Sequence, residues 1–174
     1  MLEPCQARET DLQIMSTTTL PPRRTLRFDT LQDILADCDQ FACGKITTVG
    51  KWSYAEILEH LAQAIDCFYS GFSFQAPWYV RKLMAPLIRN RFLTKSMPAG
   101  INLPSNAKSL LPPESAEIES ALRHLRESLA RLERETPSHP HPAFGMLSHG
   151  EVKQLTLRHC ELHLNFVVPS GATP

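Results

Sequence analysis

The sequence lacks an excess of charge of either sign. Lysine plus arginine and aspartate plus glutamate each number 18 among the 174 residues, so the formal net charge is zero. A neutral chain has no long-range field that would draw it to a polyanion or to an acidic surface. We therefore expect neither nucleic acid nor a membrane among its partners.

Long apolar runs are absent too. Charge or proline interrupts each apolar stretch well short of the ~20 residues needed to cross a bilayer, and Met1 to Met15 holds no apolar signal-peptide region. The pair Arg23-Arg24 resembles the start of a twin-arginine export signal, but charged residues follow where that signal needs apolar ones. We expect a cytoplasmic protein that starts at Met1 or at Met15.

Cysteine pairs with C-x-x-C spacing are also missing. The five cysteines are odd in number and scattered along the chain, a pattern typical of reduced thiols that pack as small hydrophobic side chains. We expect no disulfide framework. The cysteines are Cys5, Cys38, Cys43, Cys67 and Cys160.

Two helices are expected in the first half of the chain. After Asp29, apolar residues recur at the spacing of one helix face until Gly44. The sequence Ser53-Tyr-Ala-Glu56 is a capping box, in which two side chains satisfy free N–H groups at a helix start. This box predicts a second helix from about residue 54 to Ser70.

Two further helices are expected in the second half. Leucines spaced by threes and fours follow Pro112-Pro113 and predict a helix that starts near residue 114. Ser148-His-Gly-Glu151 is a second capping box, and the helix it begins ends before Pro169. Val152, Leu155, His159, Leu162 and Phe166 are the predicted apolar-face positions of this last helix.

Four such helices without credible strands predict an all-α fold, a four-helix bundle. Its domain covers residues 23–169, between a flexible tail at 1–22 and a short tail at 170–174. A long, partly helical excursion from Phe72 to Pro113 separates the second and third main helices, with a break near Pro86. Its basic residues could contact an acidic ligand or a membrane surface, but a solvated amphipathic face is the preferred interpretation. They are Arg81, Lys82, Arg89, Arg91 and Lys95.

Three histidines interrupt the apolar faces of these helices. His159 and His163 lie four residues apart, which places their Cβ atoms roughly 6 Å from each other on one helix face. His60 interrupts the stripe of the second helix in the same way. Because facing helices meet in a bundle core, the three imidazoles could bind one metal ion.

Other roles for these residues stay open at this stage. A single histidine on an apolar face is usually a hydrogen-bonded core residue. The H-x-x-x-H sequence is not a zincin protease motif, because Cys160 stands where the catalytic glutamate would be. Cys160 points about 100° away from His159 on a helix, so packing is favoured over ligation.

Several of these segments resemble the DinB-like superfamily of metalloenzymes. They are residues 50–63, which include Trp52 and His60, residues 141–148, and residues 157–164, which include His159 and His163. With Arg23-Arg-Thr-Leu-Arg-Phe and Met97-Pro-Ala-Gly, the chain is similar to a bacterial branch of that superfamily, a domain of unknown function. The resemblance covers nearly everything after residue 22.

The resemblance implies a divalent metal, zinc or nickel, held by His60, His159 and His163. Some characterised members of the superfamily transfer low-molecular-weight thiols, but the likeness to this branch implies no particular reaction. An ion held by three histidines keeps a coordination position open for water or a thiolate, so we expect thiol transfer to a small-molecule substrate as the first choice and metal-assisted hydrolysis as the second. His141 could act as a catalytic proton shuttle, although a loop-fixing role is favoured, and Glu56 could orient His60 although capping already accounts for it. A non-catalytic metal-binding or oligomerisation module, for instance a homodimer, is the alternative function.

Overall fold

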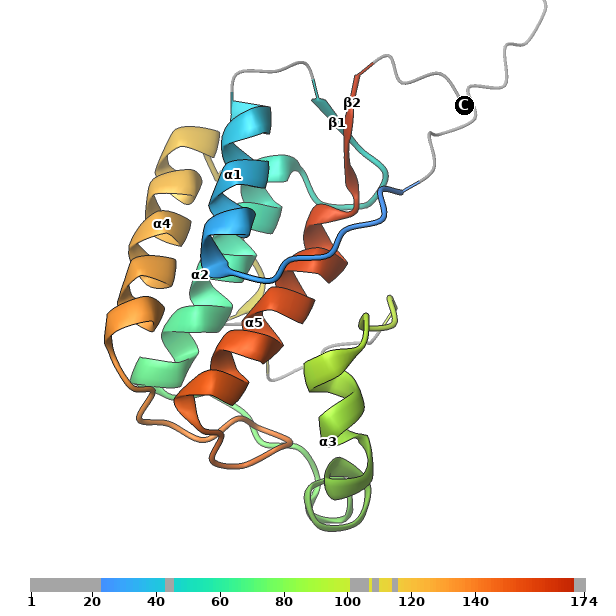
Figure 1. Ribbon diagram of the computed structural model, residues 1–174, viewed down its shortest axis with the longest axis vertical. Coiled ribbons are helices and arrows are strands. Elements are labelled where there is room, and N and C mark those ends of the chain that lie inside the picture. Colours follow the sequence, from blue (N-terminus) through green and yellow to red (C-terminus); the bar gives the residue numbers. More distant parts are fainter. Residues whose placement is uncertain (1–22, 43–45, 101–106, 108–109, 114–115, 171–174) are drawn as a thin grey trace, which may run out of the picture.

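The computed structural model describes residues 23–42, 46–100, 107, 110–113 and 116–170. These residues form five α-helices, one π-helical turn and a two-stranded sheet, so the chain is all-α with a small β addition (Figure 1). The elements in chain order are α1 (Leu31–Ala42), β1 (Ile46–Thr48), α2 (Tyr54–Ser70), η1 (Val80–Met84), α3 (Ala85–Thr94), α4 (Ile118–Arg134), α5 (His149–Leu164) and β2 (Val167–Pro169). The tails expected at 1–22 and 170–174 lie outside the described residues, except for residue 170.

Both predicted capping boxes are confirmed. The Ser53 hydroxyl accepts the Glu56 N–H, and the Glu56 carboxylate accepts the Ser53 N–H at 2.6 Å. Ser148 and Glu151 make the same reciprocal pair at the start of α5. Because these contacts satisfy N–H groups that no helical carbonyl can reach, α2 and α5 begin where the sequence predicts.

The start of α4 differs from its prediction. The helix begins at Ile118 and not near residue 114, with Glu117 as its N-cap residue. Ahead of the helix, the Ala116 N–H donates to the Pro113 carbonyl. Ile118 is consequently exposed, whereas the leucines further along the predicted face are buried. They are Leu122, Leu125, Leu129 and Leu132.

The four long helices share one hydrophobic core. In Figure 1, α2 lies beside α4 and α5, and α1 crosses the same two helices from the other side. Fully buried side chains come from each of them, as Ile34, Leu58, Leu125 and Leu164 show. Burial of these apolar faces is the main source of stability in such an assembly.

The predicted apolar face of α5 is only partly correct. Val152 and Leu155 are buried, but Leu162 and Phe166 are half-buried, and Phe166 follows the end of the helix. Because α1, α2 and α3 all contact α5, its buried residues are spread around the helix and not confined to one stripe. Leu157, Cys160 and Leu164 are core residues outside the predicted face, and of these only the packing of Cys160 was expected.

Two short strands were not expected from the sequence. β1 pairs antiparallel with β2, with Thr47 opposite Val168. The pairing forms because α5 ends at Leu164, which returns the buried Val167 and Val168 alongside β1. β2 follows α5 and β1 precedes α2 in the chain. Their pairing therefore joins the end of α5 to the segment that leads into α2 (Figure 1).

The excursion between α2 and α4 carries helical structure from Trp78 through η1 and α3. Pro86 is the second residue of α3, which continues directly from the π-helical η1, so the break expected near Pro86 is a change of helix type within one helical stretch. Pro86 has no N–H and cannot donate to the preceding turn. An ion pair between Arg89 and Glu151, 2.6 Å long, fastens α3 to the start of α5. Within the described residues, none of the helices combines the length and apolar character needed to cross a membrane.

Residues 23–30, which we call the N-terminal strap, cross α5 on their way to α1 (Figure 1). The Phe28 N–H donates to the Glu161 carboxylate at 2.7 Å, and the Arg158 guanidinium donates to the Phe28 carbonyl. Arg24 forms a two-pronged pair with Asp37, at 2.6 and 2.8 Å. The strap is therefore held by buried polar contacts to two helices.

Candidate metal centre

His60 is buried on α2 and has one fixed hydrogen bond. Its Nδ1 lies 2.7 Å from the Leu110 carbonyl oxygen. A carbonyl oxygen only accepts, so Nδ1 carries the proton and Nε2 keeps its lone pair. This lone pair is directed toward α5, where the His159 Nε2 lies 3.3 Å away. A backbone carbonyl that fixes the tautomer in this way is the usual support of a metal-binding histidine.

His159 and His163 lie one turn apart on α5 and face His60. The two ring centroids are 4.7 Å apart, and the His60 ring lies 5.1 Å from His159 and 4.6 Å from His163. One nitrogen from each of the three residues lies within 4.8 Å of the other two. The structure therefore brings together the three histidines that the sequence nominated, and this group could hold a metal ion.

Trp52 forms one wall of the histidine cluster. Its ring centroid is 4.8 Å from that of His60, and it stacks on His163 at 5.6 Å with an interplanar angle of 18°. The place of Trp52 at the cluster was not predicted, because an aromatic residue ahead of a helix gives no sign of the side chain that it will contact. The Leu110 carbonyl was missed as well, because a backbone acceptor leaves no signal in the residue type.

Burial keeps the three imidazoles in their neutral form. Desolvation lowers the pKa of His60, lowers that of His163 to about 3, and places that of His159 well below its usual value. A charge on a neighbouring histidine lowers the values of His159 and His163 further. Neutral imidazoles with available lone pairs are what a divalent metal requires.

His141 is not a member of the three-nitrogen group. Its Nδ1 accepts the Ala143 and Phe144 N–H groups, at 3.2 and 3.1 Å, and its ring stacks on Phe144 at 4.7 Å. Burial lowers the pKa of His141 to about 4. These contacts agree with the loop-fixing role, whereas the proposed proton shuttle stays a prediction. A charge on His141 is among the influences that lower the pKa of His159.

Two other side chains close to the histidines in sequence have structural roles. Cys160 is fully buried in the core, as expected, and burial raises the pKa of its thiol well above the usual value. Glu56 is engaged by the capping box and accepts the Ser53 N–H. Neither belongs to the group that could bind a metal.

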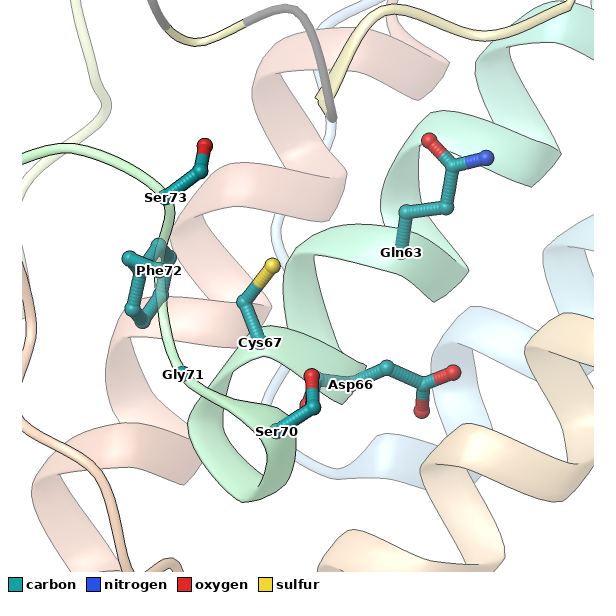
Figure 2. A pocket seen from close by; sticks show the side chains of 7 residues that line it. All are labelled: Gln63, Asp66, Cys67, Ser70, Gly71, Phe72 and Ser73. Atoms are coloured by element: carbon teal, nitrogen blue, oxygen red, sulfur yellow. The ribbon is translucent and has the colours of Figure 1, made fainter.

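A surface pocket of about 430 Å³ lies further along α2, toward its C-terminal end (Figure 2). Its lining includes none of the three histidines. Burial raises the pKa of the Cys67 thiol, so the thiol at this pocket stays protonated near neutral pH. The lining residues are Gln63, Asp66, Cys67, Ser70, Gly71, Phe72 and Ser73.

Comparison with known proteins places the chain in a family. No curated protein and no solved structure matched it. The model of one protein family matches residues 21–170, which is most of the chain. The chain therefore belongs to the family described as "Protein of unknown function (DUF1569)".

Proposed function

We propose that His60, His159 and His163 bind one divalent metal ion, zinc or nickel, in a four-helix bundle of the DinB-like type. The convergence of three neutral imidazoles from two helices is the observation that carries this proposal. The arrangement of α1, α2, α4 and α5 around one core supports the bundle assignment. The resemblance of the histidine segments supports the superfamily assignment.

The histidine geometry fits a metal ion. Zinc–imidazole bonds of 2.0–2.1 Å in a tetrahedral site place two ligand nitrogens about 3.3–3.4 Å apart. The Nε2 atoms of His60 and His159 are already separated by 3.3 Å. Nitrogen separations elsewhere in the group reach up to 4.8 Å, so small ring rotations would complete the set.

The site supports a catalytic function more than a structural one. Among the described residues, the group contains three protein ligands and no fourth histidine, cysteine or carboxylate. Three ligands with one open position are typical of catalytic zinc, whereas structural zinc has four protein ligands. A bound ion supplies Lewis acidity, which lowers the pKa of a water or thiol at the open position. We propose transfer of a low-molecular-weight thiol, with hydrolysis as the second reaction.

The chain's own residues would prepare this chemistry. The Leu110 carbonyl holds His60 in the tautomer that presents Nε2, and the Trp52 ring covers His60 and His163 on one side. A covered site excludes bulk water and strengthens electrostatic interactions. The same covering is the observation that favours the alternative, a binding module without catalysis.

Metal analysis of the His159→Ala variant tests the proposal. We expect purified wild-type protein without a histidine tag to bind stoichiometric zinc or nickel, and His159→Ala to lose it without unfolding. His139→Ala is the matched control, because His139 lies outside the three-nitrogen group. Equal metal content in wild type and His159→Ala would contradict the proposal.

The two tryptophans offer a second measurement. Trp52 contacts the cluster, whereas Trp78 is exposed on another part of the chain. Nickel should therefore quench the emission of a Trp78→Phe variant, whose remaining fluorophore is Trp52. It should leave a Trp52→Phe variant nearly unchanged. Adding a thiol to the nickel-loaded protein then distinguishes an enzyme from a non-catalytic binding module. The absorption spectrum of nickel should change only if an open coordination position lets the thiol bind the ion.

A further inference from the structure

The positive and negative charges of this neutral chain are unevenly distributed. Residues 67–113 contain six lysines and arginines and no aspartate or glutamate, whereas the rest of the chain contains 12 basic and 18 acidic residues. The described part of this basic region includes η1 and α3, which lie to one side of the four long helices (Figure 1). Residues 67–113 are therefore strongly positive, although the whole chain has a formal net charge of zero.

The same region exposes large apolar side chains. Trp78 is 70% exposed, Leu83 62% and Leu87 83%, and Tyr79 and Met84 are about half exposed. These five side chains occupy ten consecutive residues, and we call them the apolar tip. Clustered exposure of this kind marks an interaction surface, whereas isolated exposed apolar residues are normal.

Basic side chains lie between and beyond the five residues of the apolar tip. Arg81 and Lys82 are exposed within it, and Arg91 and Lys95 are exposed further along α3. Among the described residues, none of these four pairs with a carboxylate; the Arg81 guanidinium donates to Gln75. Arg89 differs, because its pairing with Glu151 holds α3 on α5. The segment that carries the apolar tip therefore has positive charges without carboxylate partners, and the Arg89–Glu151 pair joins it to α5.

We propose that η1 and the start of α3 dock on an anionic lipid surface, with the apolar tip inserted at the level of the headgroups. Aromatic rings, aliphatic side chains and basic residues without acidic ones are the composition of interfacial helices. Tryptophan and tyrosine prefer this boundary, since each ring is apolar with one polar group. This docking involves no membrane-spanning helix.

Two other occupants fit these observations less well. In a symmetric dimer through this face, Arg81 and Lys82 would lie close to the same residues of a second copy. Their positive charges would repel, because residues 67–113 contain no carboxylate to neutralise them. Single-stranded nucleic acid is bound by aromatic stacking, and the aliphatic Leu83, Met84 and Leu87 provide no stacking surface. The lipid surface accommodates both the aliphatic and the basic residues.

Vesicle binding by a full-length Trp52→Phe variant tests the proposal, because Trp78 is then the sole fluorophore. Vesicles of phosphatidylserine and phosphatidylcholine should shift its emission to the blue and co-sediment the protein. Pure phosphatidylcholine should bind at least ten-fold more weakly. Binding should also weaken as salt screens the charges.

Matched variants separate insertion from charge. Arg81→Gln combined with Lys82→Gln should weaken binding about 20- to 30-fold, since each basic residue near an anionic surface contributes about five-fold. Leu87→Ala should also weaken it. The controls, Arg123→Gln and Ile118→Ala on α4, should bind like the parent. Absence of vesicle binding, equal binding to neutral vesicles, or self-association abolished by Leu87→Ala would each overturn the proposal.

Discussion

Histidines of this chain differ in protonation because their surroundings differ. Desolvation keeps His60, His159 and His163 neutral, and His141 neutral as well. For His124, burial alone would lower the pKa, but hydrogen bonds to Asp66 and Glu59 raise it above its usual value. The residue type therefore says little about charge, and the neighbouring groups decide it.

Acid should destabilise the protein through His141. Its pKa is about 4 in the folded protein and about 6.5 in an unfolded chain, so the folded state binds fewer protons between these values. The corresponding stability is fully present above pH 6.5 and is lost as the pH falls toward 4, by up to about 3 kcal/mol. Urea unfolding of metal-free protein at several pH values measures this loss.

His141→Gln is the comparison for this measurement, because glutamine does not titrate. The difference in unfolding free energy between wild type and variant should shrink as the pH falls from 7 to 4.5. An unchanged difference over this range would show that His141 is not buried in its neutral form.

At the scale of elements, His124 links α2 to α4. Its Nδ1 lies 3.0 Å from a Glu59 oxygen and its Nε2 lies 2.9 Å from an Asp66 oxygen, and Ser128 also donates to Asp66. A doubly protonated ring can donate to both carboxylates at once, whereas a neutral ring can donate to only one. The contact is therefore strongest when His124 is charged.

Removing His124 should produce the opposite pH dependence to His141. Because the pKa of His124 is raised, its stabilisation is fully present below about pH 6.5 and is lost as the pH rises through the folded value. We expect His124→Gln to cost about 0.5–1 kcal/mol at pH 5.5, a magnitude typical of a partly exposed ion pair. Thermal unfolding at pH 5.5 and 8.5 measures it, and equal losses at both pH values would refute the charged bridge.

At the scale of the whole molecule, the N-terminal strap joins sequence segments that are far apart. Arg158 and Glu161 form a buried ion pair at 3.0 Å, and each also holds the backbone of Phe28. Burying two charges is costly unless each is paired and hydrogen-bonded, and the strap supplies one backbone hydrogen bond to each member of this pair. The Arg158 Nε and Nη1 atoms and the Glu161 Oε2 atom are buried without a hydrogen bond, so the pair depends strongly on the two contacts from Phe28. Closure of the strap and burial of the pair therefore depend on each other.

Breaking this pair should be far more costly than breaking an exposed one. Glu161→Ala leaves Arg158 buried without its partner and should lower the free energy of unfolding by about 3–5 kcal/mol. Asp39→Ala, which breaks the exposed Asp39–Arg126 pair, should cost less than about 1 kcal/mol. Urea denaturation measures the free energy of unfolding of these two variants and of a third, in which Arg158→Met is combined with Glu161→Leu. The combined variant should lose less than Glu161→Ala, and a larger loss would contradict the solvation argument.

Local signals predicted much of the helical structure. The capping boxes at Ser53 and Ser148 located the starts of α2 and α5, because a cap depends on residues within one turn. The start of α4 was predicted about four residues early, since a proline pair shows where a helix can begin but does not require it to begin there. The two strands were missed because their pairing joins residues more than a hundred positions apart.

The sequence by itself determined the all-α class and nominated His60, His159 and His163, because periodicity and helical spacing are properties of short segments. Only the tertiary structure brought His60 against α5, supplied the Leu110 carbonyl and placed Trp52 beside the rings. The exposure of the apolar tip is also a result of the tertiary structure. These outcomes depend on which faces of separate helices meet, and that choice is made by packing of the whole core.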